Sequence, residues 1–240
     1  MAGHSHWAGI KHKKDRVDKL KSKIFSKLSR EITVAAKLGD KDPDINHRLR
    51  AAIQAAKNAN MPKDNISRAV EKSQNVNGIH FEQIRYEGFG PGNIACIVET
   101  LTDNKNRTAS NLRTIFQKSG GSMASQGSAS HYFKNKGLIM IDKSEIDENS
   151  IYEYAVDLGI DDFFSLKNCY EIHCSKNNLY DIKRNLEHKV KNFIACEIAW
   201  IPDNLITLEK KNSQNFIEFI HQLEDDDDVQ RFYVNTELEL

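Results

Sequence analysis

Three short segments at the start of the chain repeat apolar side chains at helical spacing. In the first, over about 22–38, the apolar positions recur every three or four residues, the period of one buried helical face; they are Phe25, Leu28, Ile32 and Ala35. Gly39 follows as a residue favoured just past a helix end. A second helix is expected over about 46–59, and Pro62 suits the first turn of a third. The pattern predicts a small bundle of three amphipathic helices.

From about residue 76 the periodicity changes to alternation and short apolar runs, which are typical of strands. Strands expected over 84–89 and 94–101 flank the sequence Gly90-Pro-Gly-Asn93, so we predict a hairpin. The spacing Gly88-x-Gly90-x-Gly92 could also suggest a phosphate-binding loop. However, a strand follows it rather than a helix, and no Lys-Ser/Thr pair completes that motif.

Residues 137–202 show strand and helix patterns in the order βαββαβ, which is that of a ferredoxin-like split motif. The segment before it has three strand patterns, the last near 128–133, but only one helix to cover them. The chain after Pro202 supplies one more helix and one more strand. We therefore predict an α+β fold in which the chain leaves one ferredoxin-like domain, builds a second as an insertion, and returns to finish the first. The predicted domains are a basic tail with a helical bundle (1–75), a discontinuous α/β domain (76–134 plus 203–240) and an inserted ferredoxin-like domain (135–202).

Charge is distributed unevenly along the chain, although the formal net charge is zero. The first 72 residues carry 17 Lys and Arg against 8 Asp and Glu, a net +9, so the other 168 residues carry a net −9. Such asymmetry indicates a polyanionic partner. Cations also repeat at helical spacing on one face of the first helix: Lys23, Lys27, Arg30 and Lys37. The five acids at 224–228 lack the ligand spacing of a metal site and are interpreted as a solvated turn.

Composition disfavours membrane and secreted classes. No apolar run approaches the roughly 20 residues that span a bilayer, and the start of the chain lacks the apolar core of a signal peptide. We expect a cytoplasmic monomer without a membrane partner. The four cysteines form no CxxC pair, and Cys96 and Cys196 lie in apolar strand patterns, so we expect buried thiols rather than disulfides or metal ligands.

No set of residues suggests catalysis. His131 lies near Ser128 and Ser130, but three residues of one strand cannot by themselves supply a nucleophile, a base and an orienting group. If Met1 is removed, the segment Ala2-Gly3-His4 would offer an amine, amides and an imidazole to copper or nickel, which we interpret as incidental. We predict a protein that is not an enzyme, with no cofactor, no metal site and no small-molecule substrate.

The chain contains the runs Met-Ala-Gly-His-Ser-His-Trp at 1–7 and Lys-Ile-Phe-Ser-Lys-Leu-Ser-Arg-Glu-Ile-Thr-Val-Ala-Ala-Lys at 23–37, with further runs at 48–53, 58–66, 85–92 and 101–108. Together these runs resemble the YebC family. The resemblance covers nearly the whole chain. It departs at 13–17, where the family usually has Arg-Lys-Ala-Ala-Gln-like residues, and near 130–133, where a tryptophan would be expected. The resemblance implies three domains and a regulatory role, assigned in the family to DNA-bound transcription and also tied to translation.

We therefore predict a nucleic-acid-binding regulator of gene expression, in line with the DNA-binding transcriptional regulators of the family. The cations expected to neutralise phosphates are Lys11, Lys13, Lys14, Arg16, Lys19, Lys21, Lys23, Lys27, Arg30, Arg50 and Lys57. The third helix adds Lys63, Asn65, Arg68 and Lys72, which suit phosphates as well as bases. This prediction requires the cations to form an exposed positive surface rather than to lie against carboxylates of the body.

Two alternatives stay open at this point. One is a translation factor that acts on the ribosome through ribosomal RNA or tRNA contacts, and a cationic tail followed by helices suits the reading of RNA shape. The other is an adaptor whose ferredoxin-like domains bind a protein partner by a sheet edge or groove.

Overall fold

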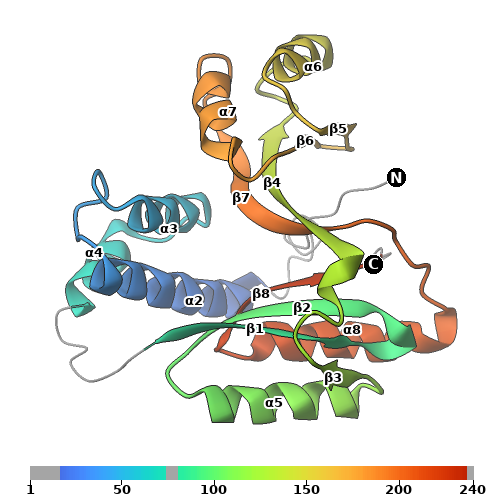
Figure 1. Cartoon of the computed structure of the whole chain (residues 1–240). Coiled ribbons are helices and arrows are strands. Elements are labelled where there is room, and N and C mark those ends of the chain that lie inside the picture. The colour runs from blue at the N-terminus through green and yellow to red at the C-terminus, as the bar shows by residue number, and fades with distance from the viewer. Residues whose placement is uncertain (1–16, 74–80, 237–240) are drawn as a thin grey trace.

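The computed structural model describes residues 17–73 and 81–236, with side chains from residue 22 onwards. Three helices are followed by two four-stranded antiparallel sheets, each with two helices on one face (Figure 1). The predicted α+β fold class is therefore confirmed. Within the described residues, no helix combines the length and the apolar character needed to cross a bilayer.

The helical unit consists of α2 (Val17–Leu38), α3 (His47–Asn58) and α4 (Lys63–Lys72). Asn46 caps α3, because its side chain accepts the Leu49 N–H and also donates to the Ala35 carbonyl of α2. Small side chains allow close helix packing, and the buried core comprises Ile32, Ala35, Ala36, Leu49, Ala52, Ala56, Met61, Ile66 and Ala69. These are largely the positions that the helical periodicity marks as apolar.

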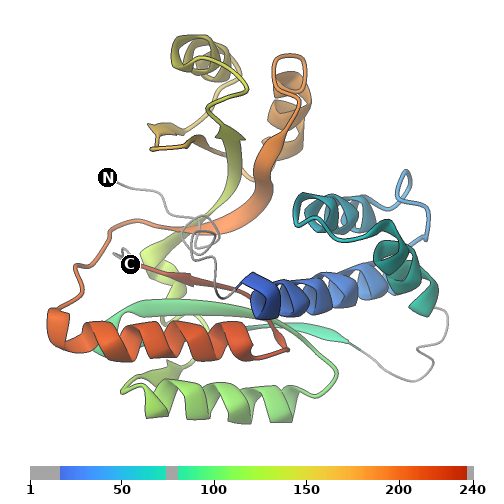
Figure 2. The same cartoon turned by 180° about the vertical axis from the view of Figure 1, so that it is seen from behind.

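The first sheet has the order β3-β1-β2-β8. Its strands are β1 (Glu82–Phe89), β2 (Ala95–Thr102), β3 (Ser122–Ala124) and β8 (Val229–Val234). The predicted hairpin joins β1 to β2 through the short turn η2 (Pro91–Asn93), in which Gly92 has φ of 73°. Helices α5 (Lys105–Lys118) and α8 (Lys210–Asp225) cover the same face (Figures 1 and 2). Phe116 of α5 and Phe219 of α8 meet edge to face in this core, with centroids 4.9 Å apart.

The second sheet has the order β5-β6-β4-β7, as expected for a βαββαβ ferredoxin-like motif. Its elements are β4 (Phe133–Asp142), α6 (Glu148–Asp157), β5 (Asp162–Ser165), β6 (Cys169–Cys174), α7 (Leu179–Leu186) and β7 (Phe193–Pro202). The chain leaves the first sheet after β3, builds the second sheet, and returns through α8 to add β8 beside β2. This is the predicted insertion, while the exact domain boundaries stay a prediction.

One expected strand is wrong. Residues 130–132 form a short 3-10 turn, η3 (Ser130–Tyr132), and the third strand of the first sheet is instead β3. The cause is Glu87, whose buried Oε2 accepts the N–H groups of Ala129 and Ser130 at 2.8 Å each. These bonds hold the chain in a turn before it enters β4. Burial alone would raise the pKa of Glu87, but these backbone donors and Arg85 lower it overall.

The two sheets meet through polar and aromatic contacts. Trp200 of β7 donates its Nε1–H to Glu99 Oε1 at 3.1 Å, and the Arg85 guanidinium lies 4.9 Å from the centre of the Trp200 ring. Arg231 of β8 pairs with Glu197 of β7 at 3.0 Å. Tyr233 packs against apolar clusters on both sheets, so the two α/β units share a packed boundary.

Candidate nucleic-acid interface

The structure places the eleven predicted phosphate contacts in three groups. Lys11, Lys13, Lys14 and Arg16 lie outside the described residues, and Lys19 and Lys21 lie in the first turns of α2, where only the backbone is described. The other five have described side chains, and the structure separates them. Lys23, Lys27 and Arg30 of α2 face the α/β body, whereas Arg50 and Lys57 of α3 are exposed.

The α2 cations contact residues 224–228, which we call the acidic turn and which comprise the last two residues of α8 and the connection to β8. Lys23 forms an ion pair with Asp225, and Lys27 Nζ donates to the Glu224 carbonyl at 2.8 Å. Arg30 Nη1 donates to the Asp227 carbonyl at 2.9 Å and to Asp228 Oδ1 at 2.8 Å. The expectation of an exposed cationic stripe is therefore corrected for these three residues. The spacing that aligns them on one face of α2 also presents them together to the turn.

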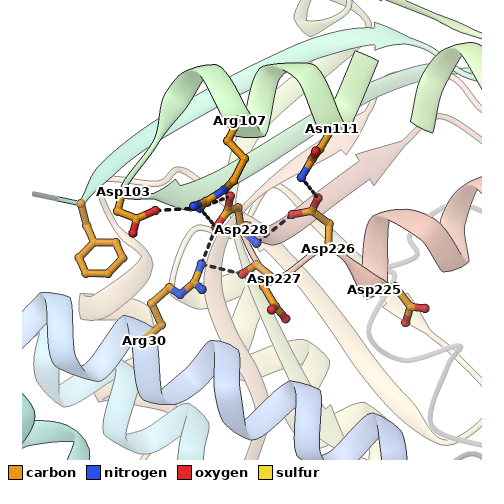
Figure 3. Close-up of a pocket in the computed structure, with 9 residues that line it drawn as sticks. Arg30, Asp103, Arg107, Asn111, Asp225, Asp226, Asp227 and Asp228 are labelled. Atoms are coloured by element: carbon orange, nitrogen blue, oxygen red, sulfur yellow. Dashed lines mark hydrogen bonds and ion pairs between the residues drawn. The ribbon is translucent and has the colours of Figure 1, made fainter. Parts of the chain in front are cut away.

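Asp228 is the centre of this contact (Figure 3). Its side chain is only 5% exposed, and its two oxygens accept hydrogen bonds from Arg30, Arg107, Thr102 and Thr108. Burial would raise the pKa of Asp228, but the bonds from Arg107, Thr108 and Arg30 hold it below its ordinary value. The interpretation of residues 224–228 as a solvated turn is thus corrected at Asp228. A single side chain ties α2 to α5 and to the first sheet.

A pocket of about 470 Å³ opens beside this carboxylate. It is lined by Arg30, Phe81, Asp103, Arg107, Asn111 and Asp225 to Asp228 (Figure 3). Acidic side chains outnumber the two arginines, and both arginines already bind Asp228, so the pocket does not suit a phosphate. Among the described residues, no group of three or more His, Cys, Asp or Glu could hold a metal ion. We interpret the pocket as part of the contact between α2 and the body.

The exposed cations of the helical unit lie on α3 and α4. They are Arg50, Lys57, Lys63, Arg68 and Lys72. In the described part of the chain, none of the five forms an ion pair with a carboxylate; Arg50 contacts His47, and Arg68 donates to Asn65 Oδ1 and the Asp64 carbonyl. Arg48, by contrast, binds Glu31 through two hydrogen bonds of 2.7 and 3.1 Å. From the sequence, the α4 residues Lys63, Arg68 and Lys72 are predicted only to suit phosphates or bases, and the structure shows all three exposed.

The buried thiols have no reactive environment. Cys96, Cys169 and Cys174 are buried and Cys196 is half-buried, and all four are free. Burial raises the pKa of Cys174 to about 11 and that of Cys196 to about 12, so both stay protonated at neutral pH.

Lys27 provides a pH-dependent test of the α2 contact. Burial lowers its pKa to about 8, against a smaller opposing effect of Glu224, Asp226 and Asp227. Between pH 8 and 10.5 the unfolded chain keeps a proton that the folded chain has lost, so this residue makes the free energy of unfolding rise with pH. Over this pH interval the contribution of Lys27 to the free energy of unfolding changes by at most about 3 kcal/mol, and solvent at the partly exposed ammonium reduces this change.

We therefore expect the Lys27→Met variant to be more stable than the wild type at pH 7, with a difference that shrinks towards pH 10. Urea unfolding of both proteins between pH 7 and pH 10 measures this difference in the free energy of unfolding. The titration of all other groups is common to both proteins and cancels in the difference. Parallel stability curves for the two proteins would show that the Lys27 ammonium is not desolvated.

Comparison with known proteins covers the whole described chain. The family model described as the TACO1/YebC protein N-terminal domain matches residues 5–76, and the model for the TACO1/YebC second and third domain matches residues 81–236. A probable transcriptional regulatory protein of Pelagibacter ubique (strain HTCC1062) is 57% identical over 235 residues, which is 98% of each chain. The crystal structure of a conserved hypothetical protein from Aquifex aeolicus matches with a TM-score of 0.85 and 41% identity over 97% of each chain. This chain belongs to the TACO1/YebC family.

Proposed function

We propose that this protein regulates gene expression by binding nucleic acid, without a catalytic step. The observation that carries the proposal is the set of exposed cations on α3 and α4: Arg50, Lys57, Lys63, Arg68 and Lys72. Unlike the cations of α2, they have no carboxylate partner in the described structure and lie at the end of the molecule away from α5 and α8 (Figure 1). When these cations neutralise phosphates, the nucleic acid releases its condensed counterions, and this release favours binding.

We propose that the nucleic acid is DNA and that the regulated step is transcription, which the name of the Pelagibacter ubique relative supports. One feature favours RNA instead. Arg68, near the middle of α4, donates to Asp64 and Asn65 of its own helix, and α4 has only ten residues. A helix that reads bases in a major groove needs several free side chains on its outer face. Contacts to phosphate and overall shape, as in RNA recognition, need no such row.

The test is a binding titration of the full chain against a DNA duplex and against a structured RNA at several salt concentrations. We call the five exposed cations of α3 and α4 the α3–α4 surface. The Arg50→Glu/Lys57→Glu/Lys63→Glu variant reverses the charge of three of them. We expect its affinity for the preferred nucleic acid to fall by about tenfold or more, and the dependence on salt to become shallower by roughly 0.7–0.9 per lost phosphate contact.

The matched control is Lys118→Glu/Lys176→Glu/Lys191→Glu, which makes the same charge change at exposed lysines of α5 and the inserted unit. An equal loss in both variants would show that net charge rather than the α3–α4 surface determines binding. Tighter binding of the duplex than of the RNA supports the transcriptional assignment, and the reverse order supports the ribosomal one.

A further inference from the structure

The acidic turn presents to α2 the same kind of groups that a nucleic acid would present. Over the five residues 224–228 it offers carboxylates to Lys23 and Arg30 and backbone carbonyls to Lys27 and Arg30. The three cations span positions i, i+4 and i+7 of the helix, or about 10 Å along its axis. A nucleic-acid strand presents more than one phosphate over such a length. The turn therefore occupies, within the same chain, a binding surface that fits a strand of phosphates.

The contact between the helical unit and the body is polar. The apolar cluster of the helical unit contains only residues of its own three helices and their connections, and the cluster of the first sheet contains only residues of the α/β body. None of the five apolar clusters in the described residues joins the two. The two sheets, in contrast, share Tyr233 and Trp200. Release of the helical unit would thus expose little apolar core.

The strengths of the individual contacts differ. The Lys23–Asp225 pair is open to solvent, with side chains 38% and 65% exposed, and pairs of this kind contribute little. Lys27 is largely buried in the contact, and this burial lowers its pKa and so disfavours its charged form. Only the pairing of Arg30 with Asp228 is well buried on the acidic side. The docked arrangement is therefore held by polar contacts, the strongest of them those of Arg30 with Asp228 and with the Leu101 carbonyl at 3.2 Å, and a polyanion that offers phosphates to the same cations competes with these contacts.

We propose that the turn 224–228 and a nucleic acid compete for one face of α2, so that the arrangement described above is a closed state of the protein. Nucleic acid that binds Lys23, Lys27 and Arg30 then releases the helical unit from the α/β body. This inference rests on the proposed function, and it adds that the acidic turn limits nucleic-acid affinity. The α3–α4 cations stay exposed in the closed state and make the first contact.

The test weakens the competitor without touching its buried anchor. In Asp225→Asn/Asp227→Asn, two exposed carboxylates are neutralised, while Asp228 and the Asp227 carbonyl that binds Arg30 are kept. We expect this variant to bind the DNA duplex or structured RNA of the titration above about two- to tenfold more tightly than the wild type. The control is Glu153→Gln/Asp157→Asn, the same change of net charge at exposed positions of α6.

Hydrogen exchange provides the second measurement. On addition of the same nucleic acid to the wild type, amides of the turn 224–228 are expected to exchange faster, while those of α3 and α4 are protected. Equal affinities of the turn variant and its α6 control, or unchanged exchange in the turn, would overturn the competition. If that result comes with a loss of binding in the α3–α4 variant, the proposed function stands and only the closed state fails. If no nucleic acid binds at all, both fail.

Discussion

Replacing Asp228 with alanine is expected to lower the free energy of unfolding by about 1–3 kcal/mol, because Arg30, Arg107 and Thr108 lose a buried charged acceptor although each keeps another partner. Arg30 loses its only carboxylate among the described residues, Arg107 keeps just the exposed Asp103, and the Thr108 hydroxyl loses an acceptor at 2.8 Å. Urea unfolding with circular dichroism measures the loss. Hydrogen exchange locates it, and α2 is expected to lose protection first.

Asp227→Ala is the matched control, since Asp227 is the exposed neighbour and contributes only its backbone carbonyl to Arg30. We expect it to change stability by less than about 0.5 kcal/mol. If the two variants proved equally stable, Asp228 would not be the residue that ties α2 to the body.

Replacing Glu87 with alanine is expected to lower the free energy of unfolding by about 3 kcal/mol or more, because it removes a buried acceptor at the boundary between the two sheets. Glu87 is 1% exposed and binds two backbone N–H groups at the start of the turn that leads into β4, and it also pairs with Arg85 at 3.2 Å. Without it these donors are buried and unpaired. Arg85 in turn packs on Trp200, so the contact between the two sheets should weaken as well.

The control for Glu87 is Glu82→Ala at the exposed start of the same strand. A thermal unfolding scan should show a clear drop in midpoint for Glu87→Ala and almost none for Glu82→Ala. Tryptophan fluorescence provides a local readout, because Trp200 lies at the affected boundary. An unchanged midpoint for Glu87→Ala would mean that water or relaxation satisfies the donors.

These two carboxylates show why sequence patterns predicted the elements better than their arrangement. Periodicity identified the three helices and the βαββαβ order because each depends on residues close in the chain. The role of Asp228 depends on Arg30 and Arg107, which lie 198 and 121 residues away. In the sequence it is one of five consecutive acids, and nothing local distinguishes it from its exposed neighbours.

The cations of α2 show the same limit for the candidate site. Helical spacing correctly grouped Lys23, Lys27 and Arg30 on one face, but it could not tell whether that face meets solvent, nucleic acid or the protein itself. The net negative charge of the rest of the chain is as consistent with an intramolecular partner for these cations as the basic segment is with a polyanionic partner. For Arg50 and Lys57 the predicted exposure is confirmed, and their contact with nucleic acid stays a prediction.

The inserted unit is attached to the rest of the chain by two strands that pair with each other. At its base Phe133 of β4 lies opposite Pro202 of β7, and the Asp203 N–H donates to the Tyr132 carbonyl at 2.9 Å. Neighbouring antiparallel strands are about 5 Å apart, a gap that a two-residue turn closes. Genetic removal of residues 134–201 would therefore need only such a turn to rejoin the chain, and the module could be gained or lost in one step of evolution.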